Sequence, residues 1–453
     1  MMTDQRITIV GAGLAGSLLA ICLARRGYSV TVFEARQDMR SSVVESGRSI
    51  NLALSDRGIA ALRQVGMDEY MLKEAVPMLG RMIHDTAGGT KLLPYSGREG
   101  EYINSVSRAG LNIALMNEAE RNPNVRFIFN ERCTDYDVAS GELSFDSGRT
   151  FRPDVTIAAD GAGSPIRQAM QRQIPGYEFS SVFLDHGYKE LHIPPGPGGG
   201  FQLEKNALHI WPRHQFMMIA LPNFDGSFTC TLFLAQKATD GPGFDGLKSE
   251  AAVFEFFEKE FPDAVPLMPT LIEDFFGNPT GSLGTVKCWP WSADGKALLI
   301  GDAAHAVVPF YGQGMNCSFE DVRVLDGLIA EDAATKNGDV DWASVFAKYG
   351  QVRKTNTDAI ADMAEENFYE MRDRVADPIF QRKRELETRL EQTYPDYFSK
   401  YSMVTFREDL PYSIAKARGN AQDELLMEIC SAAANAAEIG LDEVMERIRD
   451  LDS

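Results

Sequence analysis

The first forty residues constrain the fold more than any other part of the chain. Arg6 to Val10 is a short apolar run with β-branched residues, and Gly11-Ala12-Gly13-Leu14-Ala15-Gly16 follows it directly, before the helical pattern SLLAICLARRG. This order predicts a strand, a glycine turn and a helix. A second predicted strand, Ser29 to Phe33, ends in Glu34, roughly twenty residues after the turn. The spacing indicates a dinucleotide-binding unit, and a plain glycine-rich turn is the alternative.

Each conspicuous residue of this unit has a distinct expected role. Gly11 allows a tight turn, Gly13 lets bare backbone approach a pyrophosphate, and Gly16 lets the helix pack close to the strand. The phosphates are expected at the helix N-terminus, where backbone N–H groups are free. The Glu34 carboxylate is expected to accept a hydrogen bond from a ribose hydroxyl.

Charge and length exclude several classes of protein. The chain has 453 residues, enough for two or three cores, and its 44% hydrophobic and 24% charged residues are typical of globular proteins. Its formal net charge of −20 argues against nucleic acid or an anionic membrane as the main partner, because phosphates would be repelled. A small anionic substrate remains compatible, since one arginine can bind a carboxylate. The sequence does not indicate an oligomeric state.

Cysteine and histidine usage predicts neither disulfides nor a metal. The six cysteines are scattered without CxxC pairs, and the six histidines show no ligand-like spacing, so each histidine is expected to be structural or exposed. MMTDQRITIV passes straight into the first strand without a signal pattern, and no apolar stretch approaches the length of a membrane span. We therefore expect a soluble, cytoplasmic protein.

Three further positions are candidates for cofactor contacts. Arg48, in a polar connector, suits a phosphate partner or an ordinary surface arginine. Asp160-Gly161 follows the predicted strand Val155 to Ala159, where Rossmann-type sheets bind ligands, although Asp-Gly is also a common turn. Glycines in the segment Pro309 to Asn316 leave backbone N–H groups free at a predicted helix start.

Between Ser181 and Thr285 the pattern changes to short strands separated by PPGPGGG, PNFDG and TDGPGFDG, which predicts an antiparallel sheet. Its alternating apolar residues are core or, less often, pocket wall. Beyond Asp341 the chain has a helical pattern interrupted by three prolines. The expected fold is α/β: a Rossmann-like dinucleotide-binding domain (1–70, 98–180 and 288–375), a domain with a mostly antiparallel β-sheet (71–97 and 181–287) and a C-terminal helical region (376–453).

Three segments together resemble the class A FAD-dependent aromatic hydroxylases: GAGLAG with Glu34, the Asp160-Gly161 strand end, and GDAAHAVVPFYGQGMN. Ala158 stands where the middle motif of that family usually has glycine. The resemblance implies that the Rossmann-like domain is an FAD-binding domain and that the antiparallel β-sheet belongs to a substrate domain. It implies FAD contacts at matching positions, namely Gly11, Gly13, Gly16, Glu34, Arg108, Asp160, Asp302, Met315 and Asn316.

Further stretches, among them GRMIH, HGYKEL, ALHIWP, ENFYEM and YSMVTF, resemble more narrowly the kynurenine 3-monooxygenase branch of that family, up to about residue 413. The resemblance implies L-kynurenine as substrate. Its amino-acid end would be held by Arg81, Tyr95, Asn367 and Tyr401, and its ring by Phe233, Phe310 and Met371. Tyr311 stands where some relatives have His or Phe. The last forty residues match no motif and lack the anchor expected of the eukaryotic enzymes, so a soluble bacterial type is expected.

The implied reaction is carried out by the cofactor, with no side chain expected to be catalytic. NADPH would reduce FAD, the reduced flavin would capture O2 as a C4a-hydroperoxide, and one oxygen atom would pass to the ring, giving 3-hydroxykynurenine in tryptophan degradation. The protein would position the ring, exclude water and prevent reduction without substrate. Arg81 would pair with the substrate carboxylate.

Other functions remain open at this point. The chain could hydroxylate another aromatic acid, or act as a flavin reductase or oxidase without oxygen transfer. Trp289-Pro290-Trp291 is similar to the WxW motif of flavin-dependent halogenases, but Ser292-Ala293 is not the expected continuation. The remaining alternative belongs to a different class of protein: an interaction module that carries a flavin and has no hydroxylase activity.

Overall fold

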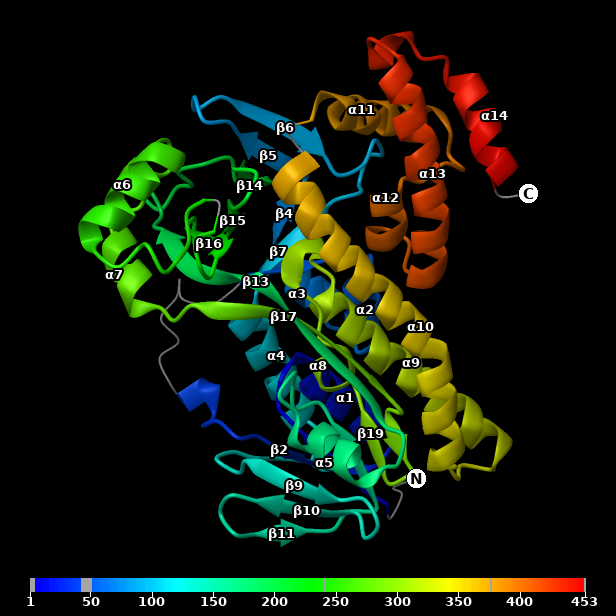
Figure 1. Ribbon diagram of the computed structural model, residues 1–453. Coiled ribbons are helices and arrows are strands. Elements are labelled where there is room, and N and C mark those ends of the chain that lie inside the picture. The colour runs from blue at the N-terminus through cyan, green and yellow to red at the C-terminus, as the bar shows by residue number, and fades with distance from the viewer. Residues whose placement is uncertain (1–4, 42–50, 240, 375–376, 452–453) are drawn as a thin grey trace.

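The computed structural model describes residues 5–41, 51–239, 241–374 and 377–451. The candidate phosphate partner Arg48 lies outside the described residues. Figure 1 shows two lobes, each built on a sheet, with a group of C-terminal helices packed beside them. Among the described residues, we find no helix that combines the length and the apolar character needed to cross a membrane.

The lower lobe in Figure 1 contains a six-stranded sheet in the order β18-β19-β12-β1-β2-β8. Its strands are β1 (Arg6–Val10), β2 (Ser29–Phe33), β8 (Val125–Ile128), β12 (Val155–Ala158), β18 (Ser292–Ala293) and β19 (Ala297–Leu299). Neighbouring strands are parallel except β18 and β19. All four residues of β12 are buried, as a parallel strand covered on both faces requires.

Helices and two smaller sheets cover this sheet. Helix α1 packs against α4 and α9, and α9 also contacts α2 and α10. The bounds are α1 (Leu14–Arg25), α2 (Asp56–Gln64), α3 (Asp68–Lys73), α4 (Arg108–Glu120), α5 (Pro165–Gln173), α9 (Gly314–Thr335) and α10 (Trp342–Tyr369). The smaller sheets have the orders β11-β10-β9 and β3-β7-β4. Their strands are β3 (Asn51–Leu54), β4 (Val76–Met78), β7 (Ile103–Ser107), β9 (Cys133–Asp137), β10 (Glu142–Phe145) and β11 (Thr150–Phe151).

The other lobe is built on a seven-stranded sheet in the order β17-β13-β16-β15-β14-β5-β6. Its strands are β5 (Gly80–His84), β6 (Thr90–Pro94), β13 (Glu178–Ile193), β14 (Ala207–Pro212), β15 (Met217–Pro222), β16 (Phe228–Ala235) and β17 (Gly281–Trp289). Neighbours are antiparallel except β5 and β14, which pair in parallel. Helices α6 (Glu250–Glu260) and α7 (Leu271–Gly277) close an apolar core on one face.

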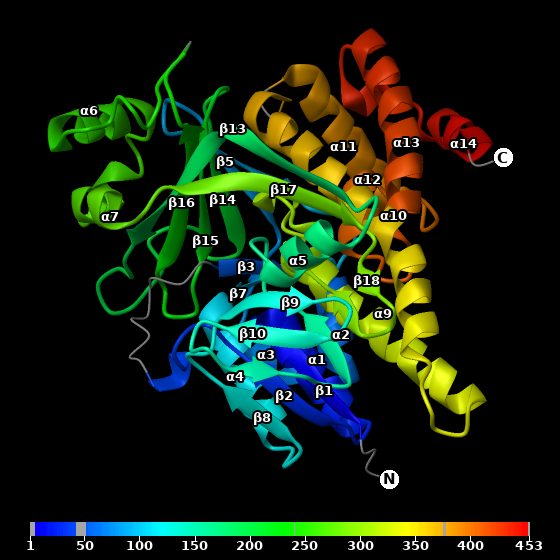
Figure 2. The same cartoon turned by 60° about the horizontal axis from the view of Figure 1, so that its bottom comes forward.

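Strands β13 and β17 join the lobes. Residues 178–183 of β13 pair with residues 284–289 of β17, beyond a register irregularity between Phe183 and Gly187. In Figure 2 this two-stranded ribbon extends from the sheet of the second lobe toward α5 and β18 of the first. The lobes are therefore connected by continuous strands as well as by side-chain packing.

The C-terminal helices follow α10, which passes into a π-helical segment, η4 (Glu370–Arg374). They are α11 (Pro378–Thr393), α12 (Lys400–Thr405), α13 (Tyr412–Ala432) and α14 (Leu441–Leu451). Pro378 occupies the first turn of α11 and Pro411 is the N-cap residue of α13, positions where the missing N–H is not needed. Leu386, Leu390 and Leu426 belong to their shared core.

The predicted fold class is confirmed, with two differences in detail. Strand β13 begins at Glu178, before Ser181, where the strand pattern was expected to begin, because its first half pairs with β17 and has mostly exposed side chains, which an apolar pattern does not reveal. Helices α6 and α7 lie within the region where the pattern predicted short strands, and they cover the sheet that those strands form. The parallel pairing of β5 with β14 agrees with the prediction of a mostly antiparallel sheet.

Candidate active site

A cavity of about 790 Å³ lies between the two lobes. Its lining extends from the glycine turn after β1 to Tyr401 on α12. Most of the predicted site residues line it: Gly11, Gly13, Glu34, Arg81, Tyr95, Arg108, Asp160, Phe233, Asp302, Phe310, Met315, Met371 and Tyr401. Gly16, Asn316 and Asn367 do not line it.

The three turn glycines differ in what surrounds them. Gly11 has φ +102°, and a Cβ there would lie 2.4 Å from the Ala159 carbonyl oxygen. A Cβ at Gly16 would lie 2.0 Å from the Gly11 carbonyl oxygen, so α1 packs directly against the turn, as expected. No atom of the described residues lies within 4 Å of the Cβ position at Gly13. Gly13 therefore faces open cavity at the N-terminus of α1, where a phosphate is favoured.

Glu34 is fixed by the turn itself. Its Oε2 accepts a hydrogen bond from the Ala12 N–H at 2.9 Å, and its Oε1 accepts from the Arg36 N–H at 2.9 Å and from Arg36 Nε at 2.8 Å. Burial opposes ionisation, but these hydrogen bonds and the Arg36 charge outweigh it and lower the pKa of Glu34. The carboxylate is thus held ionised at the end of β2.

Asp160 follows β12 on the same edge of the sheet. Within the part of the chain that the structure describes, neither of its carboxylate oxygens has a hydrogen-bond partner. Burial raises the pKa of Asp160 to about 6. A buried carboxylate without partners is costly, and a ligand with hydroxyl donors would relieve that cost.

Asp302 begins the short helix α8 (Asp302–His305) after β19. The preceding residue, Gly301, has φ +55°, and its N–H donates to Asp321 Oδ2 on α9 at 3.0 Å. A residue with a side chain would be strained at this φ. Asp321 therefore fixes the turn that presents Asp302 to the cavity.

Arg108 and Met315 line the cavity from helix starts. Arg108 is the first residue of α4, whose N-cap Ser107 accepts a hydrogen bond from the Gly110 N–H at 3.2 Å. Met315 lies in the first turn of α9. Both side chains are therefore fixed at the ends of regular elements that surround the cavity.

Asn316, next to Met315, has its side chain engaged with backbone. Its Nδ2 donates to the Ala53 and Gly312 carbonyl oxygens, each at 2.8 Å, and its Oδ1 accepts from the Ser55 N–H at 3.0 Å. It shapes the loop before α9 instead of facing the cavity.

An arginine and three tyrosines form the far end of the cavity. The Arg81 guanidinium carbon lies 5.0 Å from the centroid of the Tyr401 ring and 5.7 Å from that of Tyr95. The Tyr401 ring is stacked on Tyr95 on one side and on Tyr311 on the other, with centroids 5.2 Å and 5.6 Å apart. Arg81 Nε and Tyr95 Oη are buried without a hydrogen-bond partner among the described residues. These atoms suit a ligand with acceptor groups.

The wall between the two ends is aromatic. The centroid of the Phe310 ring lies 4.9 Å from the centroid of the Phe233 ring and 4.5 Å from that of the Phe368 ring. Met371 adds a flexible thioether from η4. Asn367 lies behind this wall, where its Nδ2 donates to the Phe310 carbonyl oxygen at 2.6 Å. It lines a neighbouring cavity of about 30 Å³ that Arg81 and Tyr401 also line.

The sequence analysis did not identify a buried group of four charged residues beside this site, Arg57, Glu320, Asp321 and Arg353, here called the buried quartet. Glu320 accepts from Arg57 Nη1 at 2.8 Å and from Arg353 Nη1 at 2.5 Å, and Arg353 Nε donates to Asp321 at 2.7 Å. Burial raises the pKa of the Glu320 and Asp321 carboxyls. The charges of the arginines outweigh this effect at Glu320, and His305 together with Arg353 outweighs it at Asp321, so both pKa values lie below their usual ranges. Two adjacent acids inside the apolar pattern CSFEDVRVL were the available signal.

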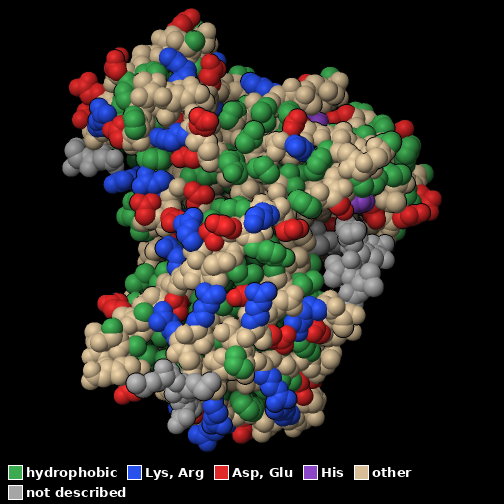
Figure 3. Space-filling model, turned by 180° about the vertical axis from the view of Figure 1, so that it is seen from behind, with side chains coloured by type: hydrophobic (Ala, Val, Ile, Leu, Met, Phe, Trp, Pro, Cys, Tyr) green, Lys and Arg blue, Asp and Glu red, His purple; other side chains and the backbone are tan. Residues whose placement is uncertain are grey.

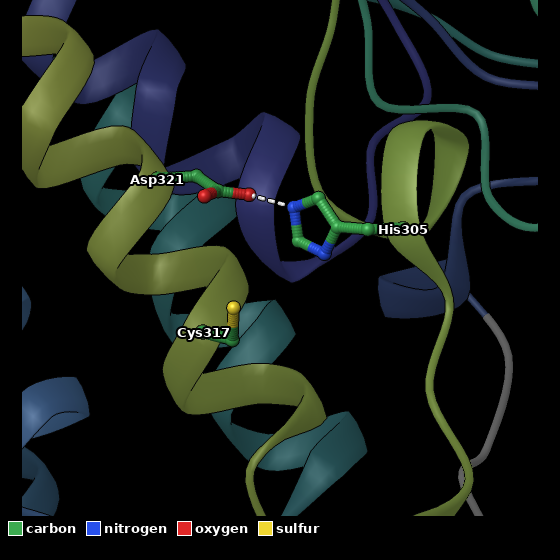
Figure 4. Close-up of side chains that lie close together, drawn as sticks. All are labelled: His305, Cys317 and Asp321. Carbon is green, nitrogen blue, oxygen red and sulfur yellow. Dashed lines mark hydrogen bonds and ion pairs between the residues drawn. The ribbon is translucent and has the colours of Figure 1, made fainter. Parts of the chain in front are cut away.

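His305, Cys317 and Asp321 lie close enough together to be considered for a metal (Figure 4). His305 Nε2 lies 2.6 Å from Asp321 Oδ2, and both Asp321 oxygens already accept hydrogen bonds from protein groups. Burial raises the pKa of the Cys317 thiol well above its usual range, which disfavours the thiolate a metal needs. The contact of His305 with Asp321 and the hydrogen bond from Arg353 to the Cys317 sulfur account for this arrangement.

The cavity has the features that FAD requires. Gly13 leaves room for a pyrophosphate at a helix N-terminus, Glu34 and Asp160 offer carboxylate oxygens to hydroxyl groups, and the cavity continues past Asp302 and Met315 to an aromatic wall. The partnerless oxygens of Asp160 fit a ligand that carries several hydroxyls.

The chain matches known proteins over nearly its full length. A family model described as an FAD binding domain matches residues 4–191 and 287–364. Kynurenine 3-monooxygenase of Myxococcus xanthus is 48% identical over 450 residues, covering 98% of this chain and 94% of that protein. The enzyme of the same name from Dictyostelium discoideum is 45% identical over 438 residues, covering 95% and 94%.

Solved structures with the same fold are more distant in sequence. A 2-methyl-3-hydroxypyridine-5-carboxylic acid oxygenase has a TM-score of 0.66 at 20% identity and covers 83% of this chain and 94% of its own. Klebsiella pneumoniae HpxO, complexed with FAD and uric acid, has a TM-score of 0.66 at 19% identity and covers 85% and 94%. The full-length matches above 40% identity, together with the FAD binding domain match, establish that the chain belongs to the kynurenine 3-monooxygenase family.

Proposed function

We propose that this protein is an FAD-dependent monooxygenase that hydroxylates L-kynurenine to 3-hydroxykynurenine with NADPH and O2. The observation that carries the proposal is a single cavity that joins a phosphate-accepting glycine turn to a buried arginine among tyrosines. The first end suits FAD, and the second suits the carboxylate of an amino acid. Relatives named for this reaction support the choice of substrate.

FAD would be held by residues of the glycine turn after β1 and by residues of other loops and helix starts that line the cavity. Gly11 and Gly13 would face the pyrophosphate, with Gly16 setting the position of α1. Glu34 and Asp160 would accept hydrogen bonds from hydroxyls, and Arg108, Asp302 and Met315 would make further contacts. Asn316 would act by holding the loop before α9 in place. When bound, FAD supplies electron transfer from NADPH and oxygen transfer from O2 to the aromatic ring.

The substrate would lie with its amino-acid end toward Arg81. The guanidinium would pair with the carboxylate in a bidentate contact, and Tyr95 and Tyr401 would add hydrogen bonds. Asn367 would support this end by holding the Phe310 carbonyl. The ring of the substrate would pack against Phe233, Phe310 and Met371, named here as the ring wall.

The side chains around the cavity would also keep water out. The ring wall and the three stacked tyrosines present mostly carbon surface. Such a surface holds an aromatic ring by apolar contact and leaves few positions for ordered water near the reacting atoms.

We further propose the division into an FAD-binding part (1–70, 98–180, 288–375), a substrate part (71–97, 181–287) and a helical region (376–453), because the two sheets and the C-terminal helices follow these ranges closely. A cytoplasmic location, the absence of nucleic-acid partners and the transient docking of NADPH stay predictions. Figure 3 shows Lys and Arg side chains interspersed with Asp and Glu side chains on one face.

The test is to follow NADPH oxidation by the FAD-loaded protein with and without L-kynurenine and to identify the product by mass spectrometry. Kynurenine is expected to stimulate oxidation, with one 3-hydroxykynurenine formed per NADPH consumed. Stimulation that yields peroxide without product would assign kynurenine the role of an effector and point to another aromatic acid as substrate. No stimulation would contradict the proposed reaction.

A further inference from the structure

The helix that carries Tyr401 is clamped at both ends. At the start of α12, Glu391 Oε1 accepts hydrogen bonds from the Ser399 N–H at 3.0 Å and from Ser402 Oγ at 2.5 Å. At its end, Arg57 Nε donates to the Val404 carbonyl oxygen at 2.9 Å. A helix-end carbonyl has no partner within its own helix, so Arg57 supplies one.

Arg57 also holds the connection that follows. Its Nη2 donates to the Leu410 carbonyl oxygen at 2.5 Å, and its guanidinium carbon lies 3.9 Å from the centroid of the Tyr412 ring at the start of α13. Tyr412 Oη in turn donates to Gln313 Oε1 at 2.9 Å, in the loop before α9. Both sides of the α12–α13 connection are therefore attached to one side chain.

Arg57 itself belongs to the first lobe and not to the C-terminal helices that it contacts. It lies on α2, is fully buried, and donates its third hydrogen bond to Glu320 on α9, within the buried quartet. Asp321 of the quartet holds the Gly301-Asp302 turn. The quartet thus connects a turn on the cofactor side of the cavity with the helix that carries Tyr401 on the substrate side.

We infer that Arg57 is a positioning residue for the substrate end of the cavity: it fixes α12, and through α12 it fixes Tyr401 between Tyr95 and Tyr311. This inference rests on the proposed function, because Tyr401 matters here as part of the kynurenine site. Arg57 does not line the cavity, so its effect reaches the substrate through Tyr401. The planar fork of arginine serves three separated acceptors, and a lysine ammonium cannot occupy all three positions.

The experiment compares R57K with R353K in the FAD-loaded protein. Both substitutions keep the charge of the buried quartet. Arg57 donates hydrogen bonds to the carbonyl oxygens of residues 404 and 410, whereas the hydrogen bonds of Arg353 go to residues of α9. Kynurenine binding is titrated through the perturbation of the flavin absorbance, and FAD affinity and thermal unfolding are measured in parallel. R57K should weaken kynurenine binding about tenfold, as expected for the loss of hydrogen bonds to a charged group. R353K should leave it unchanged.

A double variant tests whether the effect passes through Tyr401. If it does, R57K combined with Y401F should weaken binding by less than the product of the two single effects, since both remove the same contact. Multiplicative effects, equal effects of R57K and R353K, or unchanged kynurenine binding in R57K would each overturn the inference. If R57K is not recovered folded, R57Q/E320Q removes the same two carbonyl contacts without leaving a net buried charge, and the same expectations apply.

The outcome for the unaltered protein separates this inference from the proposed function. A protein whose flavin absorbance does not respond to kynurenine contradicts the proposed function and the inference together. A protein that binds kynurenine while R57K binds it equally well contradicts the inference alone.

Discussion

Tyr401 lies nearly parallel to Tyr95, with an interplanar angle of 9° and ring centroids 5.2 Å apart. Tyr95 directly follows β6 of the second lobe, and Tyr401 belongs to the C-terminal helices. Their contact closes the end of the cavity beside Arg81. The C-terminal helices therefore form part of the candidate substrate site, in addition to covering the lobes.

Arg81→Ala should abolish tight kynurenine binding while leaving FAD bound. The variant removes the charged partner of the substrate carboxylate from a buried position, and truncating one member of such a pair weakens binding by about a hundredfold or more. Kynurenine titration of the flavin absorbance measures the effect, and the KM for kynurenine should rise in parallel.

The control for this prediction is Arg126→Ala, which removes an exposed arginine on β8. Kynurenine binding should not change in this variant. A near-normal KM in Arg81→Ala would remove Arg81 from the substrate site.

Tyr401→Phe should have a milder effect than Arg81→Ala. Phenylalanine keeps the stacking with Tyr95 and Tyr311 and loses one hydrogen bond to the charged amino-acid end of the substrate, which is worth about 1.5 kcal/mol, or about tenfold in binding. Tyr401→Ala should be worse because it also removes the stacked ring. Equal binding in Tyr401→Phe and the unaltered protein would mean that the hydroxyl makes no contact with kynurenine.

Gly13→Ala and Gly16→Ala should separate cofactor binding from folding. The Cβ added in Gly13→Ala would meet no atom of the described residues within 4 Å. The FAD-free protein should therefore lose less than about 1 kcal/mol, and this loss arises because alanine is a poorer N-cap than glycine. The same Cβ would occupy the space in front of the turn and should weaken FAD binding by about ten- to a hundredfold.

In Gly16→Ala the Cβ would lie 2.0 Å from the Gly11 carbonyl oxygen, so the fold itself should lose about 1 to 3 kcal/mol. Thermal unfolding of the FAD-free proteins and FAD fluorescence titration measure the two quantities. Normal FAD affinity in Gly13→Ala would show that the pyrophosphate does not approach this turn.

The stability of the second lobe should fall below pH 6.5 because of His209. Its Nδ1 lies 2.8 Å from His84 Nε2, and its Nε2 lies 2.8 Å from the Glu204 carbonyl oxygen. Burial lowers the pKa of His209 from 6.5 to about 4. The unfolded chain therefore takes up a proton that the folded chain does not accept until about pH 4. Between pH 6.5 and about pH 4 the free energy of unfolding therefore decreases as the pH falls. The decrease is about 1.4 kcal/mol per pH unit and about 3 kcal/mol in total.

Urea unfolding at pH 7 and at pH 5 measures this dependence. The free energy of unfolding of His209→Asn should change less between the two pH values than that of the unaltered protein. His214→Asn, which alters an exposed histidine at φ +57°, is the matched control and should keep the full dependence. An equal pH dependence in all three proteins would contradict the assignment to His209.

The fold was predictable where one local pattern determines one element. The bounds of β1 and β2 agree with the apolar runs that predicted them. Strand β13 was harder, because residues 178–183 are exposed and obtain their partner from β17, about a hundred residues later. Non-local pairing of this kind leaves no local signal.

The residues of the site likewise divide into those that a local sequence pattern predicted and those that it did not. Gly11, Gly13 and Glu34 were predictable because they are close in sequence and belong to one turn. Arg81 and Tyr401 carried no local pattern and entered through family resemblance alone. Arg57 and Arg353 were missed because their partners Glu320 and Asp321 lie far away in the sequence, so spacing alone does not distinguish a buried ion pair from charged residues on a solvated helix face.

The position of β19 beside β12 in the first sheet has a consequence for synthesis of the protein. Because β13 to β17 lie between them in the chain, the six-stranded sheet of the first lobe cannot be completed on the ribosome before Leu299 has emerged. Tyr401 emerges about a hundred residues later, which at typical elongation rates is roughly 5 to 20 seconds. A nascent chain can therefore assemble the FAD-binding turn before the substrate end of the cavity exists.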